Sequence, residues 1–428
     1  MPARRGAQSG SRSTRRGGAG IPPVVEASPP RRAGTIQPGQ PDYLLLVATA
    51  MLVIVGLLAV YTSSFAVAYH EFGDANYFVF KQAIFAVAGL MALVVFMQLD
   101  YHKLRFLSVP MLAISLASLV IVLSPLGVER NGAQRWIEIG PASFQPSEFA
   151  KLSVIVYVSA WLAARGSDVK HFSLGFVPFV IFMSVVGALI IAEPDMGTTI
   201  IIVLVACTLF FVAGAPITHL ALLLGAGASV SYLVIQTKEY QLDRLTSFFS
   251  PESDPSGLGF QVIQLLVALG SGGPIGIGWA ESRQKHLFVP ASHTDGVFAI
   301  LGEEVGFVGL MMILGIFAFF IFRALKVTLK SRDSFATFLG IGIISWIAYQ
   351  TLINILGITR TIPLTGVPLP FLSYGGSALI SLLASVGILL SISRYTAEKP
   401  YAQRQAKTTF RPVRGDERAD PAYEGSPA

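Results

Sequence analysis

Ten long apolar segments dominate this chain of 428 residues and limit what it can fold into. A segment of about 20 apolar residues is long enough for an α-helix to cross the hydrocarbon core of a bilayer. Charged residues make up only 13% of the chain, whereas soluble domains carry about 25%. We therefore predict an all-α polytopic membrane protein with about ten transmembrane helices. The segments cover residues 43–65, 77–98, 105–125, 147–164, 172–192, 196–213, 216–236, 296–324, 336–358 and 372–393.

Polar tails precede and follow the apolar segments. Residues 1–41 are rich in Arg, Gly, Ser and Pro, and residues 396–428 are also polar. Such compositions bury too little apolar surface to offset the entropy of ordering the chain. We therefore predict one transmembrane domain, residues 42–395, between two disordered tails.

Basic residues are distributed unevenly between the two sides of this predicted bundle. Most Lys and Arg lie in the two tails and in the short connections that share their side, such as 323–332. The positive-inside rule then predicts that both termini are cytoplasmic. The same topology puts the two longest connections outside the cell. These are residues 126–146 and the large loop between the seventh and eighth spans, residues 237–295.

Composition also excludes several classes of site. The only cysteine, Cys207, lies inside an apolar segment, so the chain has neither an intramolecular disulfide nor a cysteine-based metal site. The six histidines show no metal-ligand spacing. The net charge of +6 arises from tails and short loops, which membrane topology explains, so we predict no nucleic-acid partner.

Asp295 stands where the large loop meets the eighth span. One interpretation is structural: Thr294 or Asp295 could cap the helix by accepting hydrogen bonds from its first amides. The other is catalytic, because partial burial raises the pKa of a carboxylate toward the range of a general base. The residues alone leave both open.

Glu303 and Glu304 follow in the same span. At about 100° per residue they point roughly 80° and 180° away from Asp295, so the three acids cannot face one small site. A buried carboxylate in a bilayer needs a partner or water. We predict that both pair with cations or backbone groups, and keep a proton path as the alternative.

Residues 131–152 hold a second group of candidates. Arg135 and Trp136 lie in the outer loop, where a tryptophan commonly anchors at the membrane interface. Glu148 and Lys151 are three residues apart in the fourth span and therefore share a helix face. An ion pair is the structural interpretation of this spacing, and a direct role in the reaction is the alternative.

Three further outer stretches carry unusual residues. Glu193 and Asp195 share a tight turn, for which we favour a solvated turn over a cation site. Residues 259–290 begin as an amphipathic helix and then become glycine-rich, which predicts close approach of backbone to a ligand or the bilayer. Arg283 and Lys285 in this stretch could contact phosphate. Residues 361–377 are rich in Pro and Gly, and such non-helical backbone at membrane depth indicates a cavity or burial in protein.

Six motifs occur in order along the chain and together carry a resemblance. They are RW at 135–136, QPSEFAK at 145–151, EPDMGTT at 193–199, SRQK at 282–285, HTDGVFAILGEEVGF at 293–307 and PLPFLSYGGS at 368–377. On these motifs, residues 43–395 resemble the SEDS family (shape, elongation, division and sporulation), which includes RodA and FtsW.

The resemblance implies a peptidoglycan glycosyltransferase that polymerises lipid II at the outer face of the plasma membrane. The donor would be the growing chain on undecaprenyl pyrophosphate, and the acceptor a sugar 4-hydroxyl of another lipid II. It implies that Asp295 is the catalytic base. It also implies a substrate-binding role for Arg135, Trp136, Glu148, Lys151 and Lys285. Mg²⁺ or Mn²⁺ could offset the pyrophosphate charge.

Residues 61–82 resemble the division branch of the family more than the elongation branch. That branch implies a class B penicillin-binding protein transpeptidase and other divisome membrane proteins as partners, at the division septum. The rival interpretations are an elongation-type polymerase, a lipid II flippase, and a scaffold that activates a transpeptidase without catalysis.

Overall fold

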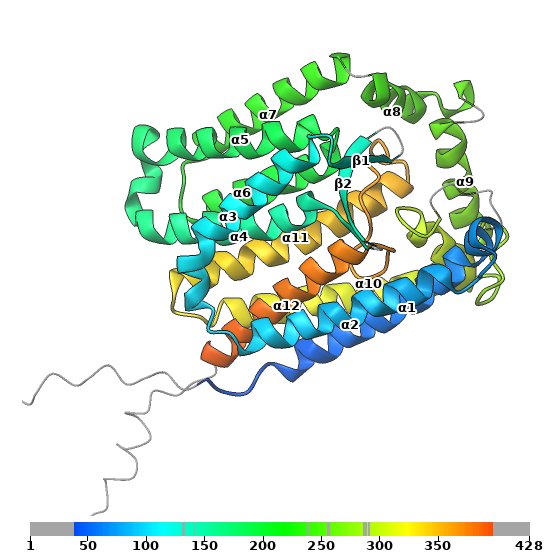
Figure 1. The fold of residues 1–428 in the computed structure, drawn as a ribbon, viewed down its shortest axis with the longest axis horizontal. Coiled ribbons are helices and arrows are strands. Elements are labelled where there is room, and N and C mark those ends of the chain that lie inside the picture. Colours follow the sequence, from blue (N-terminus) through cyan, green and yellow to red (C-terminus); the bar gives the residue numbers. More distant parts are fainter. Residues whose placement is uncertain are drawn as a thin grey trace, which may run out of the picture. The chain divides into compact units, whose positions relative to one another are not determined.

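The computed structural model describes the apolar part of the chain and confirms its helical architecture (Figure 1). It describes residues 38–130, 133–140, 142–237, 239–254, 257–285, 289 and 292–396, so nearly all of both predicted tails lies outside the described residues. Ten long helices coincide with the ten predicted segments. They are α1 (Tyr43–Phe72), α2 (Tyr77–Gln98), α3 (His102–Val122), α4 (Pro146–Arg165), α5 (Val177–Ala192), α6 (Met196–Val212), α7 (Ile217–Thr237), α10 (Val297–Thr328), α11 (Ser334–Ile358) and α12 (Gly376–Thr396).

The lengths of these helices suit a membrane. Within the described residues, nine helical stretches are long and apolar enough to cross a bilayer, and α6 is slightly shorter at 17 residues. A short 3-10 helix (Gly166–Lys170) and one π-helical turn (Phe172–Phe176) join α4 to α5. The protein is therefore a multi-pass membrane protein.

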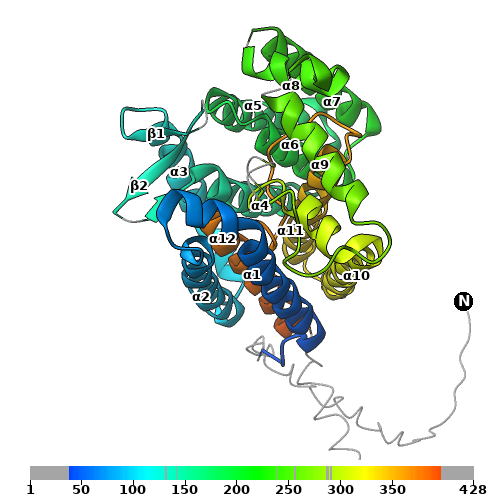
Figure 2. The ribbon, with the colours of Figure 1, turned by 90° about the vertical axis from the view of Figure 1, so that its right-hand side faces the viewer.

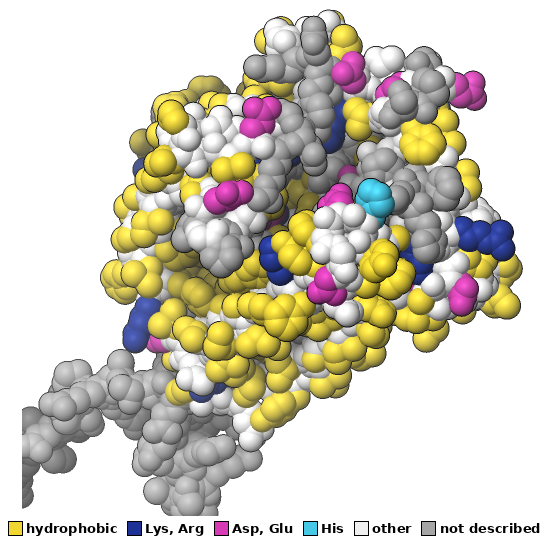
Figure 3. Space-filling view, turned by 45° about the vertical axis from the view of Figure 1, so that its right-hand side comes forward, with side chains coloured by type: hydrophobic (Ala, Val, Ile, Leu, Met, Phe, Trp, Pro, Cys, Tyr) yellow, Lys and Arg dark blue, Asp and Glu magenta, His cyan; other side chains and the backbone are white. Residues whose placement is uncertain are grey.

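Burial differs strongly from helix to helix. The most apolar stretch of α12 is 89% buried, and α12 packs against α2, α4, α10 and α11. The most apolar stretch of α7, at the edge of the bundle, is only 11% buried. Apolar side chains also cover much of the visible side surface (Figure 3), as expected where lipid replaces water.

Side-chain caps explain where several helices begin. Asp42 accepts a hydrogen bond from the Leu45 amide at the start of α1, and Asp333 does the same for Phe335 at the start of α11. Asp42 also pairs with Arg323 of α10 at 2.7 Å, which holds its pKa below the ordinary value against the opposing effect of burial. The Gly39 amide donates to the Arg394 carbonyl, which joins the residues just before α1 to the end of α12.

The connection 126–146 forms a small antiparallel sheet, which we did not predict. Its strands are β1 (Gly127–Arg130), β2 (Ala133–Ile139) and β3 (Ala142–Phe144), in the order β1-β2-β3. The register pairs Val128 with Trp136 and Ile137 with Phe144. The sheet contacts α3, α4 and α12, and we call this end of the bundle the sheet end.

The large loop between α7 and α10 folds onto the same end (Figure 2). It contains α8 (Glu239–Phe249), a 3-10 turn (Pro251–Ser253) and α9 (Leu258–Ser271), which packs on α10 and α11. The sheet, α8 and α9 thus all lie at this end of the bundle, and α9 contacts α10.

The glycine-rich segment after α9 lies against a break in α10. Gly306 has a left-handed φ of 68° inside the helix, and the amides of Ile277 and Gly278 bond to the carbonyls of Glu303 and Glu304. A Cβ at Gly276 would lie 2.1 Å from the Glu304 carbonyl. The glycines therefore permit close approach to another helix, and approach of this segment to a ligand or the bilayer stays a prediction.

Candidate active site at the sheet end

Asp295 lies just before α10 and is 9% exposed. The N-cap of α10 is Gly296, so neither Thr294 nor Asp295 occupies the N-cap position that the capping interpretation gave them. The Thr294 hydroxyl instead donates to the Asp295 carboxylate at 3.2 Å. The carboxylate is therefore held just before the helix by the neighbouring Thr294 hydroxyl.

Side chains from two helices of the large loop face Asp295. Arg244 of α8 contributes a positive charge, and Gln261 of α9 contributes a side-chain hydrogen bond. Burial is the largest influence and raises the pKa of the Asp295 carboxyl above its ordinary value, while Arg244, Gln261 and Thr294 oppose it. A carboxylate with a raised pKa is a better base near neutral pH.

Residues 359–375, between α11 and α12, form the wall opposite these helices. This non-helical segment is buried at Val367, Leu369 and Phe371, which confirms the prediction from its prolines and glycines. We call it the re-entrant segment. Arg244 donates to its Leu364 carbonyl at 2.9 Å, so the cation beside Asp295 also holds this wall.

Buried amides bind the carbonyls of the re-entrant segment. Asn354 of α11 donates to Val367, Gln350 of α11 donates to Pro368, and Gln82 of α2 donates to Ser373. Backbone without its own helical bonds needs such partners at membrane depth. The segment is thus fixed by side chains from separate helices.

Glu148 and Lys151 form the predicted ion pair. Lys151 Nζ lies 2.8 Å from Glu148 Oε1, and the two residues are only 2% and 3% exposed. The ammonium also donates to Gln350 at 2.9 Å and lies over the Trp346 ring. The pair is therefore connected through Gln350 to the re-entrant segment.

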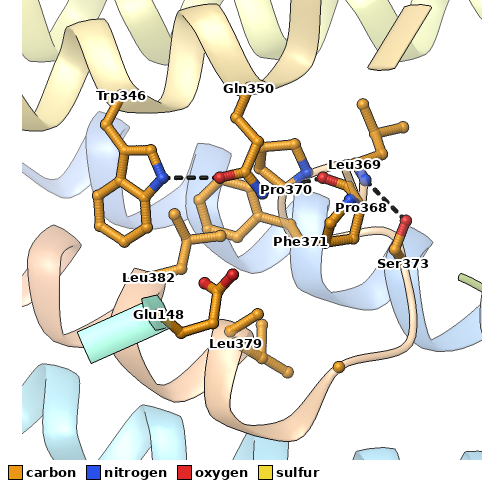
Figure 4. Close-up of a pocket in the computed structure, with 12 residues that line it drawn as sticks. Glu148, Trp346, Gln350, Pro368, Leu369, Pro370, Phe371, Ser373, Leu379 and Leu382 are labelled. Atoms are coloured by element: carbon orange, nitrogen blue, oxygen red, sulfur yellow. Dashed lines mark hydrogen bonds between the residues drawn. The ribbon is translucent and has the colours of Figure 1, made fainter. Parts of the chain in front are cut away.

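A pocket opens between Glu148 and the re-entrant segment (Figure 4). Trp346 and Gln350 line one side of it, and the second carboxylate oxygen of Glu148 has no hydrogen-bond partner among the residues that the structure describes. Pro368, Leu369, Pro370, Phe371 and Ser373 complete much of the wall. The structure thus places Glu148 and Lys151 next to the re-entrant segment.

Lys285 lies in a different cluster. Its ammonium pairs with Glu304 at 3.2 Å and donates to the Ala280 carbonyl, and the residue is buried. Glu303 accepts hydrogen bonds from Ser282 and from the amides of residues 283 and 284. The structural interpretation of Glu303 and Glu304 is confirmed, and a phosphate contact by Lys285 stays a prediction.

Arg135 reaches from β2 to the turn between α5 and α6. It donates to the carbonyls of Glu193, at 3.0 Å, and Pro194. Trp136 follows in β2 with a half-buried side chain. Gly197, just beyond the turn, contacts the re-entrant segment closely enough that a Cβ there would meet Val367 at 2.4 Å. Arg135 is therefore connected to the re-entrant segment through the turn between α5 and α6.

The turn itself is buried, so our prediction of a solvated turn is wrong. Glu193 is 0% exposed, and Asp195 caps α6 through the Thr198 amide at 3.1 Å. Burial, and then the neighbouring Asp195, raises the pKa of Glu193 to about 9, while Arg135 lowers it. Turn composition misled us because Arg135 covers the turn, a contact between segments far apart in sequence.

An aromatic cluster adjoins Asp295 on the side of α2. His293 stacks on Phe78 at 4.4 Å and meets Tyr374 edge-on. Burial lowers the pKa of His293 to about 4, so the ring is neutral at pH 7.

Four residues of this site were not among our candidates: His293, Arg244, Gln261 and Asn354. Buried amides inside apolar segments were the available signal for Asn354 and Gln350.

The described residues do not fit a dedicated metal site. Nowhere among them do three His, Cys, Asp or Glu side chains come together as ligands. The predicted Mg²⁺ or Mn²⁺ therefore has no ligand set in this part of the chain.

Comparison with known proteins places this architecture. The family described as cell cycle protein, covering FtsW, RodA and SpoVE, matches residues 43–398. Stage V sporulation protein E of Bacillus subtilis is 40% identical over 363 residues, covering 85% of this chain and 99% of that protein. The probable peptidoglycan glycosyltransferase FtsW of Trichlorobacter lovleyi is 37% identical over 371 residues, covering 86% and 96%.

Solved structures share the fold. One from a study of structural coordination of polymerization and crosslinking by a peptidoglycan synthase complex has a TM-score of 0.70 and 29% identity, covering 84% of this chain and 99% of that chain. The rod shape determining protein RodA of Thermus thermophilus has a TM-score of 0.62 and 25% identity, covering 84% and 98%. The chain belongs to the FtsW, RodA and SpoVE family of cell cycle proteins.

Proposed function

We propose that the protein is a peptidoglycan glycosyltransferase that polymerises lipid II during septal cell-wall synthesis. Several relatives are named as probable peptidoglycan glycosyltransferases of the FtsW type. The observation that carries the proposal is the buried Asp295 carboxyl with its raised pKa, where α8, α9, α11 and the re-entrant segment meet. The sheet end is hollowed in the view of Figure 3, with charged side chains in its wall.

In the proposed reaction Asp295 is the general base. The 4-hydroxyl of the acceptor sugar attacks the anomeric carbon of the donor, and its proton passes to the Asp295 carboxylate. A new carbon–oxygen bond forms as the bond to pyrophosphate breaks, so the anomeric centre is inverted. Burial favours this proton transfer, because a base with a raised pKa holds the proton more strongly.

The charge of the leaving pyrophosphate needs cations nearby. Arg244 is the cation whose charge reaches Asp295 in the structure. Lys285 is held in the Glu304 pair, so contact with pyrophosphate would require it to leave that pair. A divalent cation, Mg²⁺ or Mn²⁺, would arrive with the pyrophosphate, and titrating either into a metal-free assay tests this.

The membrane orientation is part of the proposal. The basic tails and short basic connections support a cytoplasmic location for both termini, and the sheet end would then face outside. Lipid II would reach Asp295 from the outer leaflet of the plasma membrane at the septum. Accessibility labelling of a cysteine introduced at position 295 tests this orientation, and labelling from the cytoplasm would contradict it.

The proposed partner is a class B penicillin-binding protein with transpeptidase activity, together with other divisome membrane proteins. A solved structural neighbour comes from a peptidoglycan synthase complex in which polymerization and crosslinking are coordinated. Co-purification of the chain with such a transpeptidase from its own bacterium tests the partner.

The deciding experiment compares the wild-type chain with Asp295→Asn. Both are reconstituted with the transpeptidase and given labelled lipid II. We expect glycan strands from the wild type and none from the variant. Equal polymer from both would remove the proposed base. Movement of lipid II across the membrane without polymer would favour a flippase, although the acids such a transporter would use, Glu148 and Glu304, are ion-paired.

A further inference from the structure

Three polar side chains follow one face of α11 at intervals of four residues. They are Trp346, Gln350 and Asn354, and all are buried. Residues at this spacing lie one above another on a helix. Polar groups buried in an apolar helix are costly unless they have partners. The partners of these three therefore indicate what the face does.

Asn354 joins two segments that are far apart in the sequence. Its side-chain nitrogen donates to the Asp295 main-chain carbonyl at 3.0 Å and to the Val367 carbonyl at 2.8 Å. An amide nitrogen carries two hydrogens, so one group can satisfy both carbonyls. Asn354 thus sets the spacing between the backbone that carries Asp295 and the re-entrant segment.

Gln350 makes the neighbouring connection, and its amide has a defined direction. Its oxygen accepts hydrogen bonds from Trp346 at 2.7 Å and from Lys151 at 2.9 Å. Its nitrogen is therefore turned toward the Pro368 carbonyl, at 2.9 Å. Lys151 is in turn held by Glu148 at 2.8 Å. The ion pair thus orients the amide that binds the residue after Val367.

We propose that Asn354 is a positioning residue for glycosyl transfer, which holds the Asp295 backbone in register with the re-entrant segment. Gln350, oriented by Lys151, fixes the adjacent carbonyl of that segment. The proposal rests on the proposed function, in which Asp295 is the base. A general base must come within about 3 Å of the proton that it takes. A displacement of about 1 Å can lower a rate about 100-fold, so the amide acts on the chemical step.

The test replaces the amide in three ways. Asn354→Leu keeps the approximate volume without donors, Asn354→Asp keeps the shape but presents acceptors, and Asn354→Ser keeps one donor. Thr351→Val is the matched control, because this buried hydroxyl of α11 donates within its own helix, to the Ile347 carbonyl. Each full-length variant is reconstituted with the transpeptidase, and polymerisation rates are measured across lipid II concentrations.

We expect Asn354→Leu and Asn354→Asp to lower kcat between tenfold and about 100-fold, with KM within about twofold of wild type. Asn354→Ser should fall between these variants and the wild type, and Thr351→Val should match the wild type. Thermal unfolding of each preparation gives the folded fraction, to which the rates are normalised. A structural role alone would not produce a loss confined to kcat.

Three results would overturn the proposal: wild-type kcat in Asn354→Asp, a raised KM with unchanged kcat, or a rate loss that disappears after normalisation. Asp295→Asn, assayed in parallel, separates this proposal from the proposed function. Activity in Asp295→Asn removes the base itself. An inactive Asp295→Asn beside fully active Asn354 variants removes only the positioning role.

Discussion

Two groups of buried acids lie near the start of α10, and their surroundings differ. Glu303 and Glu304 bind residues 280–285, which belong to a single connection lying against the break in the helix. Asp295, eight residues before Glu303 in the chain, receives groups from α8, α9 and α11, and α11 links its backbone to the re-entrant segment.

Glu303 and Glu304 hold the connection 280–285 against α10, whereas Asp295 is the candidate for the reaction. Both oxygens of Glu303 accept hydrogen bonds from the loop, and Glu304 is ion-paired with Lys285. Asp295 lies where α8, α9, α11 and the re-entrant segment meet. Burial is the largest influence on the pKa of its carboxyl. Loss of the first kind of acid should be seen in stability, and loss of the second in rate.

The largest expected effect is on the rate of Asp295→Asn. A positioned general base raises the rate of a reaction about 10²–10⁴-fold. The rate of polymerisation should therefore fall at least about 100-fold. The amide is neutral and similar in shape, so the thermal unfolding midpoint should stay the same or rise. The measurement pairs a lipid II polymerisation assay with a thermal melt. A large fall in the midpoint would place Asp295 among the structural acids.

Glu304→Gln should show the opposite pattern. Removing one partner of a buried ion pair leaves an uncompensated charge, which costs about 3–5 kcal/mol. The Lys285 ammonium is that charge here. We expect a clearly lower unfolding midpoint, and the double variant Glu304→Gln with Lys285→Met should recover part of it. An unchanged midpoint with lost activity would move Glu304 into the active site.

Lys151→Met extends the comparison to the ion pair of α4. The variant leaves the buried Glu148 carboxylate without its ammonium partner. We expect this to lower the free energy of unfolding by about 3–5 kcal/mol. Adding Glu148→Gln should restore stability because no buried charge remains. Polymerisation by the double variant then distinguishes the two roles of the pair. Full recovery would show that its charges are not needed for substrate binding.

Gly272→Ala tests how tightly the loop is fastened against α10. A Cβ at this position would lie 2.0 Å from the Gly302 carbonyl, so the backbone must shift, at a cost of about 1–3 kcal/mol. Gly270→Ala is the matched control, because a Cβ there meets nothing within 4 Å and alanine favours the helix. Equal melts for the two variants would contradict this packing.

The spans were predictable because each carries its signal within about 20 consecutive residues. The sheet was not, because its strands of 4, 7 and 3 residues are too short to show a clear period beside the apolar segments. Glycine-rich composition correctly indicated close backbone approach but could not identify α10 as the neighbour. Each missed feature depends on which distant segments meet.

The site was predicted only in part, because some of its residues carry a local signal and others are brought together from distant segments. Asp295 stood out by its position, and the spacing of Glu148 and Lys151 identified their ion pair. Arg244 and Gln261 lie on helices of the large loop, and nothing local in the sequence indicates that they face Asp295. The buried Asn354 could have been noticed, since a polar residue within a span usually has a partner.

Glu193→Gln concerns a third buried acid, and its effect on activity is expected to be the smallest of the series. Its pKa of about 9 means that the folded protein keeps the proton between pH 4.5 and 9, whereas the unfolded chain, with the ordinary value, releases it. The stability of the wild type should therefore fall as pH rises through this window.

The neutral amide of Glu193→Gln resembles the protonated acid and does not titrate. The variant should thus gain stability relative to the wild type from pH 5 to pH 8 in thermal melts, with activity retained at pH 7. A stability difference that is independent of pH would mean that Glu193 is ionised in the folded protein, which would contradict this prediction.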